Sequence, residues 1–335
     1  MVNLKRILLT GGAGFIGSHT ALSLFAAGYE VVLFDNFSTS SRSVVDRIRC
    51  VTGAQIPFIE GDILDETCLT KVLVVEKIDG VIHFAGLKSI GDSLAQPLQY
   101  FNSNVAGTIS LLNAMRTANL KTLVFSSSAN IYGTPQYLPI DEKHPKSVDN
   151  PYGRTKLHIE AMLADLVNSE PDWRISCLRY FNPVGAHSSG LIGEDTLVTS
   201  TNLMPNILKV ATGESSCLTI HGNDYETLDG TGVRDFIHVM DLAEGHMSAL
   251  KFLNVNTGLH VVNLGTGRGH SVLEMVKMFE TVSGLSIPCK IEARRKGDVG
   301  VCYADVTVAR QLFGWSASRD LTDMCSSAWK FRCKA

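Results

Sequence analysis

The sequence predicts an α/β fold: a Rossmann-type, doubly wound parallel sheet, followed by a smaller, irregular α+β lobe at the C-terminal end. Three observations lead to this prediction. Short apolar runs alternate with amphipathic stretches of helix length through the first half of the chain, as they do in βαβ units. A glycine-rich turn follows the first of these runs, and the regular alternation breaks down after Asn182.

The first half contains the clearest elements. Strands are expected at residues 7–10, 30–35, 57–60, 81–84, 122–126 and 174–179, where apolar and β-branched side chains gather in short runs. The most regular helical patterns lie between them, at residues 14–27, 92–118 and 152–167. Because strands and helices alternate, the strands should be parallel, with helices on both faces of the sheet.

The second half is less regular. Residues 182–235 are rich in loop-forming side chains, with one helix expected at 203–212 and one strand at 217–221. Strands at 236–239 and 261–264 and helices at 241–252 and 271–283 follow. We therefore predict one domain over residues 1–181 and a smaller lobe over residues 182–335, whose later strands return to the first domain.

Composition and charge exclude several classes of protein. Hydrophobic residues make up 45% of the 335 residues and charged residues 19%, as in an ordered globular protein. The net charge of −3 argues against nucleic-acid binding. The eight cysteines form no CxxC pair, so neither a metal site nor a disulfide framework is expected. No signal peptide is visible and no apolar run is long enough to span a membrane, which predicts a cytoplasmic protein.

The glycine-rich turn after the first strand predicts a dinucleotide site. Gly11, Gly14 and Gly17 have the spacing that allows a tight turn, close approach of the backbone to a pyrophosphate, and close packing of helix on strand. The helix that follows would direct unpaired N–H groups at the anion. A glycine triplet alone also fits an ordinary turn before a helix, so its context decides the interpretation.

Acidic and small residues at the ends of the next strands supply that context. Asp35 ends the second strand, 18 residues after Gly17, where a carboxylate binds ribose hydroxyls and repels a 2′-phosphate. NAD is therefore favoured over NADP; Arg42 and the serines beside it are the only argument for NADP, and a solvated loop explains them equally well. Residues 61–63 and 84–86 end the third and fourth strands, along the expected crevice.

A catalytic group is expected beside this crevice. Ser128 closes a run of three serines at the end of the fifth strand, and Tyr152 and Lys156 share one face of the following helix. A tyrosine that acts as a base near neutral pH needs its pKa lowered by about three units, roughly 4 kcal/mol. A nearby ammonium and a positive nicotinamide ring would both favour the phenolate, and a serine hydroxyl can relay a proton. The Tyr-x-x-x-Lys spacing alone also fits a surface helix.

Together these motifs resemble the extended short-chain dehydrogenase/reductase superfamily and, more closely, the UDP-glucose 4-epimerase family. The resemblance runs from about residue 6 to residue 330. Its most specific segments are residues 88–93, 178–187, 202–205, 229–239 and 263–269.

The resemblance implies an activity: NAD-dependent interconversion of UDP-glucose and UDP-galactose. Tyr152 would take the proton of the 4-hydroxyl while C4 gives hydride to NAD, and Ser128 would hydrogen-bond the 4-oxygen. Lys156 would lower the pKa of the tyrosine and bind the nicotinamide ribose. The 4-keto sugar would then rotate and take hydride back from the tightly bound NADH.

The resemblance also implies two sets of contacts. The NAD set is Gly11, Gly14, Phe15, Ile16, Gly17, Asp35, Asn36, Ser38, Thr39, Ser40, Asp62, Ile63, Phe84, Ala85, Gly86, Lys88, Ser103, Ser126, Tyr152, Lys156 and Phe181. The UDP-sugar set is Lys88, Ser128, Tyr152, Asn182, Asn202, Leu203, Thr219, His221, Arg234, Arg295, Asp298 and Cys302. Within it the two arginines would neutralise the diphosphate, and residues 219–221 would pass the uracil.

Three positions depart from the family pattern. Ser103 stands where an Asn is expected near the cofactor, and His221 stands where an aromatic residue often faces the uracil. Cys302 occupies a pocket-wall position that is Tyr in some members. Since a small side chain leaves room for a 2-acetamido group, UDP-GlcNAc and UDP-GalNAc are hypothesised as further substrates.

Several alternatives stay open at this point. Nucleotide-sugar dehydratases and decarboxylases are not among them: they usually carry a Glu two positions after the serine that ends the fifth strand, and here Asn130 stands there, which removes the acid that their chemistry needs. An epimerase of another UDP-sugar, a non-catalytic NAD-bound sensor and a net dehydrogenase that releases NADH remain as rivals. The family suggests a homodimer, which we expect to form through residues 93–115 and 152–167. The chain also ends slightly early for the family.

Overall fold

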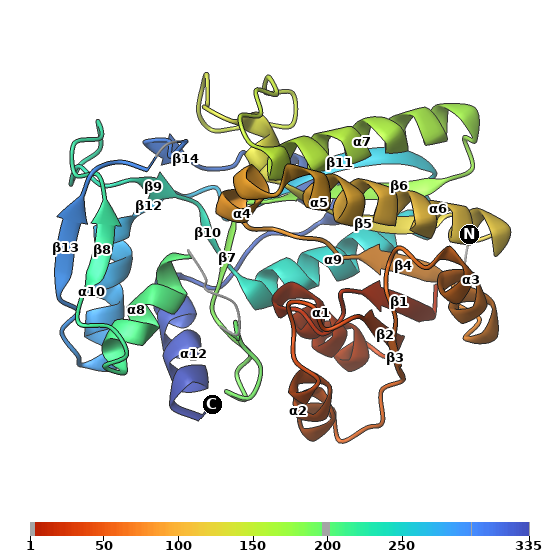
Figure 1. Cartoon of the computed structure of the whole chain (residues 1–335), viewed down its shortest axis with the longest axis horizontal. Coiled ribbons are helices and arrows are strands. Elements are labelled where there is room, and N and C mark those ends of the chain that lie inside the picture. Colours follow the sequence, from red (N-terminus) through yellow and green to blue (C-terminus); the bar gives the residue numbers. More distant parts are fainter. Residues whose placement is uncertain (1–3, 196–201, 296, 335) are drawn as a thin grey trace.

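The computed structural model describes residues 4–195, 202–295 and 297–334. Its centre is a parallel sheet of seven strands in the order β11-β6-β5-β4-β1-β2-β3 (Figure 1). The strands are β1 (Arg6–Thr10), β2 (Glu30–Asp35), β3 (Phe58–Glu60), β4 (Gly80–His83), β5 (Thr122–Ser128), β6 (Arg174–Tyr180) and β11 (Gly258–Leu264). The predicted α/β fold with a doubly wound parallel sheet is confirmed.

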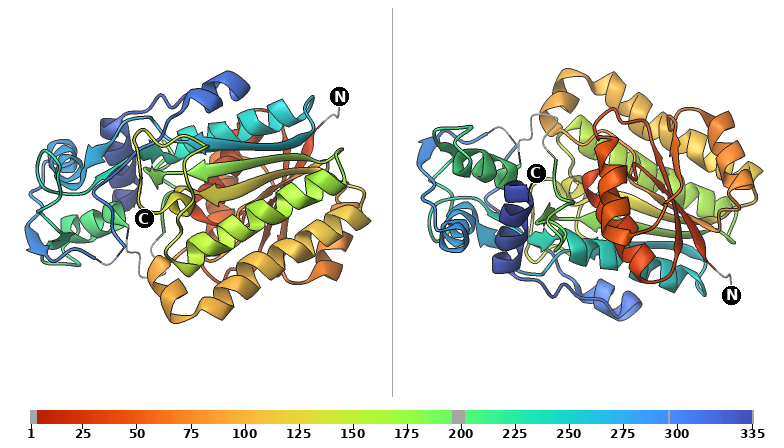
Figure 2. Two further views of the ribbon diagram at one scale, coloured as in Figure 1. Left: turned by 90° about the horizontal axis from the view of Figure 1, so that it is seen from above. Right: turned by 90° about the horizontal axis from the view of Figure 1, so that it is seen from below.

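Both faces of this sheet are buried, which explains why its strands are almost continuously apolar. Ile7 and Leu9 of β1 face one hydrophobic cluster, whereas Leu8 faces another. The first cluster lies under α1 (Phe15–Ala26), α2 (Ser43–Thr52), α9 (Val239–Leu253) and α11 (Thr307–Phe313). The second lies under α3 (Glu66–Val75), α6 (Gly107–Thr117) and α7 (Pro151–Ser169). Figure 2 views these two helical layers from opposite sides.

The helix predicted over residues 92–118 is wrong as a single element. The structure divides it into α4 (Ile90–Ala95), α5 (Pro97–Tyr100), a π-helical turn η1 (Phe101–Ala106) and α6. Pro97 has no N–H to donate and restricts the residue before it. Gln96 accordingly leaves the helical region, with φ −132° and ψ 57°.

The remaining elements build a second body beside the carboxyl ends of the strands (Figure 1). Its strands pair as β7 (Asn182–Val184) with β10 (Phe236–His238), as β8 (Leu218–His221) with β13 (Cys289–Glu292), and as β9 (Val233–Arg234) with β12 (His270–Ser271) and β14 (Val301–Cys302). Helices α8 (Leu203–Ala211), α10 (Val272–Ser283) and α12 (Leu321–Lys334) cover them and enclose a separate apolar core.

Five strands of this body, β7, β9, β12, β13 and β14, were not predicted; all except β13 have only two or three residues and carry no readable periodicity. Although α9, β11 and α11 come late in the chain, they lie against the seven-stranded sheet. A domain boundary at residue 181 stays a prediction. No helix in the described ranges is long and apolar enough to cross a membrane.

Candidate active site

The glycine-rich turn between β1 and α1 packs so closely against its own backbone and the loop after β4 that Gly11 and Gly17 leave no space for a side chain. Gly11 has φ +68°, and a Cβ there would lie 2.7 Å from the backbone N of Ala85. A Cβ on Gly17 would overlap the Gly11 carbonyl and lie 2.9 Å from Cα of Gly12. No side chain caps the first turn of α1, which also has no acidic residue. The open N–H groups and the missing side chains fit a dinucleotide pyrophosphate.

Asp35 lies at the end of β2 beside this turn. Its buried carboxylate accepts hydrogen bonds from the backbone N–H of Ala13 (3.0 Å), from that of Phe37 (2.9 Å) and from the hydroxyl of Ser40 (2.8 Å). The carboxylate therefore ties the glycine turn to the loop after β2. The three hydrogen bonds leave one lone pair of the Asp35 carboxylate free, and a ribose hydroxyl can donate to it.

The other adenosine-side candidates line the ends of β2 and β3. Asn36 donates to Asp62 (2.9 Å), which joins these two strand ends. Ser38 donates its backbone N–H to the Asn36 side chain (3.0 Å), and Thr39 beside it is exposed. Ile63 is buried against Gly107 of α6, so it contributes to the sheet core as well as to the crevice wall.

The segment after β4 is held by a residue that the sequence did not single out. Asn104, buried in η1, accepts from the backbone N–H of Leu87 (2.8 Å) and donates to the Leu87 carbonyl (3.0 Å). It also donates to the Thr155 hydroxyl on α7 (3.0 Å). Asn104 thus connects residues 86–88 to the helix that carries Tyr152 and Lys156. Ser103 is its half-buried neighbour in the same turn.

Tyr152, Lys156 and Ser128 come together at the carboxyl ends of β5 and β6. Helix α7 starts where the side chain of Asn150 accepts from the Gly153 N–H (2.8 Å) and Pro151 occupies the first turn. Tyr152 and Lys156 are 9% and 5% exposed. The Lys156 ammonium donates to the Ser126 carbonyl (2.6 Å) and lies 6.0 Å from the centre of the Tyr152 ring. A hydrogen bond joins Tyr152 to Ser128.

Burial shifts the pKa values of both Tyr152 and Lys156. Burial raises the pKa of Tyr152 above its usual value, although the hydrogen bond with Ser128 acts in the opposite direction. Burial also lowers the pKa of Lys156 to about 8. A lowered pKa of Tyr152 was expected from the ammonium together with the positive nicotinamide ring, and in the protein without the cofactor burial dominates. Loss of water around the buried phenol raises its pKa more than Ser128 lowers it, so further positive charge is needed to favour the phenolate.

Position 130 carries an amide where dehydratases and decarboxylases carry an acid. The backbone N–H of Asn130 lies 3.2 Å and its side-chain Nδ2 lies 3.0 Å from the Ser128 oxygen, and both donate to it. The amide therefore holds the serine hydroxyl in place. It cannot supply the carboxylic acid that an elimination step requires.

A buried charge network lies behind the catalytic group. Glu160, one helical turn after Lys156, accepts from Nη2 of Arg179 (2.6 Å) and from the Ser127 hydroxyl (2.6 Å). Arg179 also donates to Tyr132 (2.9 Å), which donates to Asn263 (2.6 Å). Sequence reasoning missed this network. The only available signal was the spacing of Glu160, which continues the face of Tyr152 and Lys156.

A second buried contact supports the loop after β4. The Tyr180 hydroxyl is hydrogen-bonded to His246 of α9, and the ring of Phe84 lies 4.8 Å from the His246 ring, centre to centre. Ala85 donates its N–H to the Thr10 carbonyl (3.0 Å). Phe181 is buried in the apolar cluster against which Cys302 packs.

The second body places four of the substrate candidates on three short strands, β8, β9 and β14. Arg234 of β9 and Cys302 of β14 are direct neighbours in register. Thr219 and His221 alternate on β8 with the buried residues Leu218 and Ile220. Burial raises the pKa of Cys302 to about 11. Its thiol is therefore uncharged near neutral pH.

The other substrate candidates of the second body lie in loops and at the ends of helices or strands. Arg295 and Asp298 form an ion pair with each other (3.0 Å), so a diphosphate would share this arginine with the aspartate. Asn202 donates to Glu194 (2.8 Å), and Glu194 also pairs with Lys88 (3.4 Å). Leu203 begins α8, and Asn182 begins β7 with its side chain exposed.

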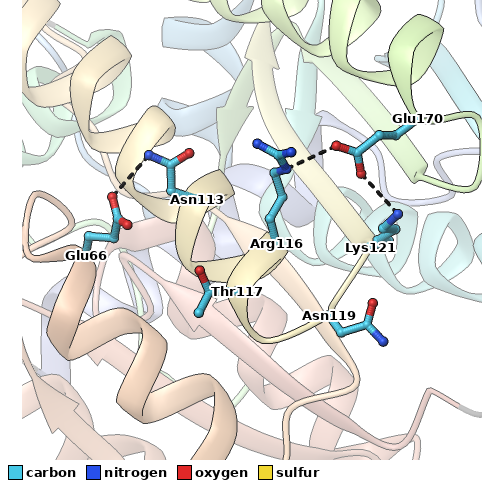
Figure 3. A pocket seen from close by; sticks show the side chains of 7 residues that line it. All are labelled: Glu66, Asn113, Arg116, Thr117, Asn119, Lys121 and Glu170. Atoms are coloured by element: carbon cyan, nitrogen blue, oxygen red, sulfur yellow. Dashed lines mark hydrogen bonds and ion pairs between the residues drawn. The ribbon is translucent and has the colours of Figure 1, made fainter.

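A hollow at the opposite edge of the sheet contains none of the candidates. It is lined by Glu66, Asn113, Arg116, Thr117, Asn119, Lys121 and Glu170 (Figure 3). Lys121 directly precedes β5 and Glu170 follows α7, so the hollow lies at the amino ends of the strands. Its charges pair among themselves, as Glu170 does with Arg116 and Lys121 (3.0 Å each). Ligands of such sheets bind at the carboxyl ends instead.

The glycine turn and the Ser-Tyr-Lys group define a dinucleotide-binding protein of the short-chain dehydrogenase/reductase type. The family described as GDP-mannose 4,6 dehydratase matches residues 8–328. The UDP-glucose 4-epimerase of Dictyostelium discoideum is 52% identical over 98% of this chain and 95% of its own length. The chain belongs to the UDP-glucose 4-epimerase family.

Two solved structures are similar over the whole fold. One is a UDP-glucose 4-epimerase from Stenotrophomonas maltophila with bound NAD and formylated UDP-arabinopyranose, 48% identical with a TM-score of 0.97 over 98% of each chain. The other is a UDP-glucose 4-epimerase from Bifidobacterium longum in complex with NAD⁺ and UDP. It is 45% identical, with a TM-score of 0.95 over 98% of each chain.

Proposed function

We propose that this chain interconverts UDP-glucose and UDP-galactose, with NAD as its resident cofactor. The observation that supports the proposal most directly is the buried Ser128–Tyr152–Lys156 group beside the glycine turn. Relatives at about half identity over nearly the whole chain are UDP-glucose 4-epimerases, and solved relatives hold NAD with UDP or a UDP-sugar.

The residues of this group have two roles, transfer of the proton and orientation of the groups that react. When bound, NAD would supply the acceptor for the C4 hydride and, once reduced, the donor of hydride to the opposite face of the 4-keto sugar. The Tyr152 oxygen removes and restores the proton of the 4-hydroxyl. Ser128, oriented by Asn130, hydrogen-bonds the 4-oxygen. Lys156 holds positive charge next to the phenol, since its ammonium is anchored on the Ser126 carbonyl.

Substrate binding is divided between a firmly held nucleotide and a loosely held hexose. Arg234 and Arg295 neutralise the diphosphate. Thr219 and His221 lie along the uracil, while Asn182, Asn202 and Asp298 provide polar contacts. Since inversion at C4 requires the 4-keto sugar to turn over, binding energy has to come mainly from the UDP part.

An assay with UDP-galactose as the only added substrate tests the proposal. The purified protein should form UDP-glucose without an added oxidant and without accumulating reduced nicotinamide. A stoichiometric rise in nicotinamide absorbance would instead indicate a net dehydrogenase. Binding of UDP-galactose without conversion would indicate a non-catalytic sensor.

Cys302 supports a broader substrate range. Its small side chain lies beside Arg234, where a tyrosine would fill the pocket wall. We therefore expect wild-type protein to interconvert UDP-GlcNAc and UDP-GalNAc. Cys302→Tyr should lower that rate at least about tenfold, the low end of what exclusion of a group from a pocket produces, and keep turnover of UDP-galactose. Wild-type protein that does not convert the N-acetyl sugars would refute this part.

Exposed apolar side chains support a homodimer. Ile90, Leu94, Leu98 and Ile109 project from α4, α5 and α6, and Leu98 is 83% exposed. Such residues on neighbouring helices are typical of a surface covered by a second copy. Leu98→Glu should shift the mass measured by light scattering from dimer towards monomer. Leu228→Glu, on a distant loop, is the control.

A cytoplasmic location is also part of the proposal. All eight cysteines are free thiols, as expected in a reducing compartment. Cell fractionation with a soluble cytoplasmic marker tests it, and recovery with an oxidising compartment would contradict it.

A further inference from the structure

A loop of the second body reaches across to the first helices of the dinucleotide half. Residues 187–195, here called the strap, follow β7 and run down between α12 and the first helices of the chain (Figure 1). Helix α12 holds one side of the strap. Lys330 and Lys334 donate to the carbonyls of Ser188 (2.6 Å) and Ser189 (3.0 Å), and Gly193 packs against the ring of Phe331. The strap is therefore attached to the second body.

Two ion pairs attach the other side of the strap to the dinucleotide half. Arg47 of α2 donates from Nη2 to the Asp195 carboxylate at 2.9 Å, and also donates to the Ser43 hydroxyl. Nζ of Lys88, in the segment after β4, lies 3.4 Å from Oε1 of Glu194. Both pairs join residues more than 100 positions apart in the chain.

The positions of Arg47 and Lys88 relative to the strands of the sheet indicate which part of the crevice the strap covers. Strand β1 lies between β4 and β2. Lys88 follows β4 and Arg47 follows β2, so the ion pairs flank the carboxyl end of β1. That end opens into the glycine turn, where a pyrophosphate binds in this fold. A dinucleotide on the turn would then lie beneath a loop anchored on both sides.

We propose that the strap retains the resident dinucleotide, and that the Arg47–Asp195 ion pair is its latch. This inference rests on the proposed function. NAD leaves the crevice when the strap separates from α2 and from the segment after β4. Arg47 is a positioning residue, since it acts through the strap and not on reacting atoms.

The solvent exposure of the Arg47–Asp195 pair determines how much this pair can slow the exchange of NAD. The side chains of Arg47 and Asp195 are 28% and 35% exposed, so solvent screens their attraction. Pairs of this kind change equilibria about two- to fivefold and weaken with added salt. The latch therefore slows cofactor exchange modestly, in a manner that depends on ionic strength.

The experiment follows exchange of bound NAD for isotopically labelled NAD in the purified, NAD-loaded full-length protein. Arg47→Ala and Asp195→Ala should each exchange about two- to fivefold faster than wild type at low salt. The difference should disappear at about 1 M salt, where the screening length falls to about 3 Å. The charge-swapped double variant R47D/D195R should return towards the wild-type rate.

Arg49→Ala is the matched control. Arg49 lies on the same helix, and its ion-pair partner is Asp46 of that helix (3.2 Å). Its loss should leave exchange unchanged. Equal exchange rates in wild type, Arg47→Ala and Arg49→Ala would overturn the latch, as would faster exchange in all variants or failure of the charge swap. Wild-type protein that binds no NAD would overturn the proposed function together with the latch, whereas an NAD-loaded epimerase with unaltered exchange would overturn the latch alone.

Discussion

At the scale of single residues, burial controls the protonation of the catalytic group. Tyr152 lies in a dry site that raises the pKa of its phenol, and the same site lowers the pKa of Lys156 to about 8. In the protein alone the tyrosine keeps its proton. Proton abstraction therefore requires additional positive charge near the phenol, and the dinucleotide site lies next to it. This couples the acid–base chemistry to the loaded site.

Removal of the phenolic oxygen tests this role. Tyr152→Phe keeps the ring and its packing but loses the group that transfers the proton. We expect kcat for UDP-galactose to fall about 10²- to 10⁴-fold, with UDP binding unchanged by calorimetry. Tyr137→Phe is the control, because the Tyr137 hydroxyl contacts Asp141 on an exposed loop. Comparable losses in both variants would refute the assignment.

At the scale of elements, the catalytic helix is fixed to the sheet by buried charge. Glu160 on α7 and Arg179 on β6 are almost fully buried. The guanidinium of Arg179 donates to both carboxylate oxygens of Glu160. Asn104 fixes the same helix to the loop after β4. These contacts define the position of Tyr152 relative to the glycine turn more strongly than helix propensity does.

Loss of the buried pair should be costly. Glu160→Leu leaves the Arg179 guanidinium buried without its main partner, which costs about 3–5 kcal/mol in comparable cases. Urea denaturation should show this loss of unfolding free energy, and the double variant E160L/R179M should recover part of it. Lys121→Ala, at the exposed pairs of Figure 3, should change stability little. An effect of Glu160→Leu no larger than that of Lys121→Ala would contradict the argument.

At the scale of the whole molecule, several buried histidines connect its layers in neutral form. Burial lowers the pKa of His19 and His83 to about 3 and that of His238 and His246 to about 4. In the unfolded chain these groups titrate near 6.5. Between pH 6.5 and 4 the unfolded chain therefore binds more protons than the folded protein, and stability falls as the pH falls.

The melting temperature should follow this linkage. Each histidine contributes up to about 1.4 kcal/mol per pH unit once the pH is well below 6.5. We expect a fall in melting temperature from pH 6.5 to pH 5, above the range where carboxylates with ordinary pKa values titrate. His246→Gln should reduce the slope, because one titrating group is lost. A melting temperature that stays constant over this window would refute the prediction.

The sequence by itself determined the features that depend on neighbouring residues. The glycine turn, the order of the large strands and the helix bearing Tyr152 and Lys156 follow from backbone geometry and side-chain periodicity, which act over a few residues. The break at Pro97 could have been read in the same way, since a proline lacks an N–H, but the helix predicted over residues 92–118 missed it. The other features, with the family motifs, were sufficient to predict the fold and the position of the candidate site.

The tertiary structure alone decided features that join distant parts of the chain. Glu160 meets Arg179, Tyr180 meets His246, and Arg47 meets Asp195 only after the sheet and the second body have come together. The raised pKa of Tyr152 likewise depends on how much water the packed site excludes. Burial and long-range pairing depend on how many distant elements pack together, so no local sequence pattern predicts them.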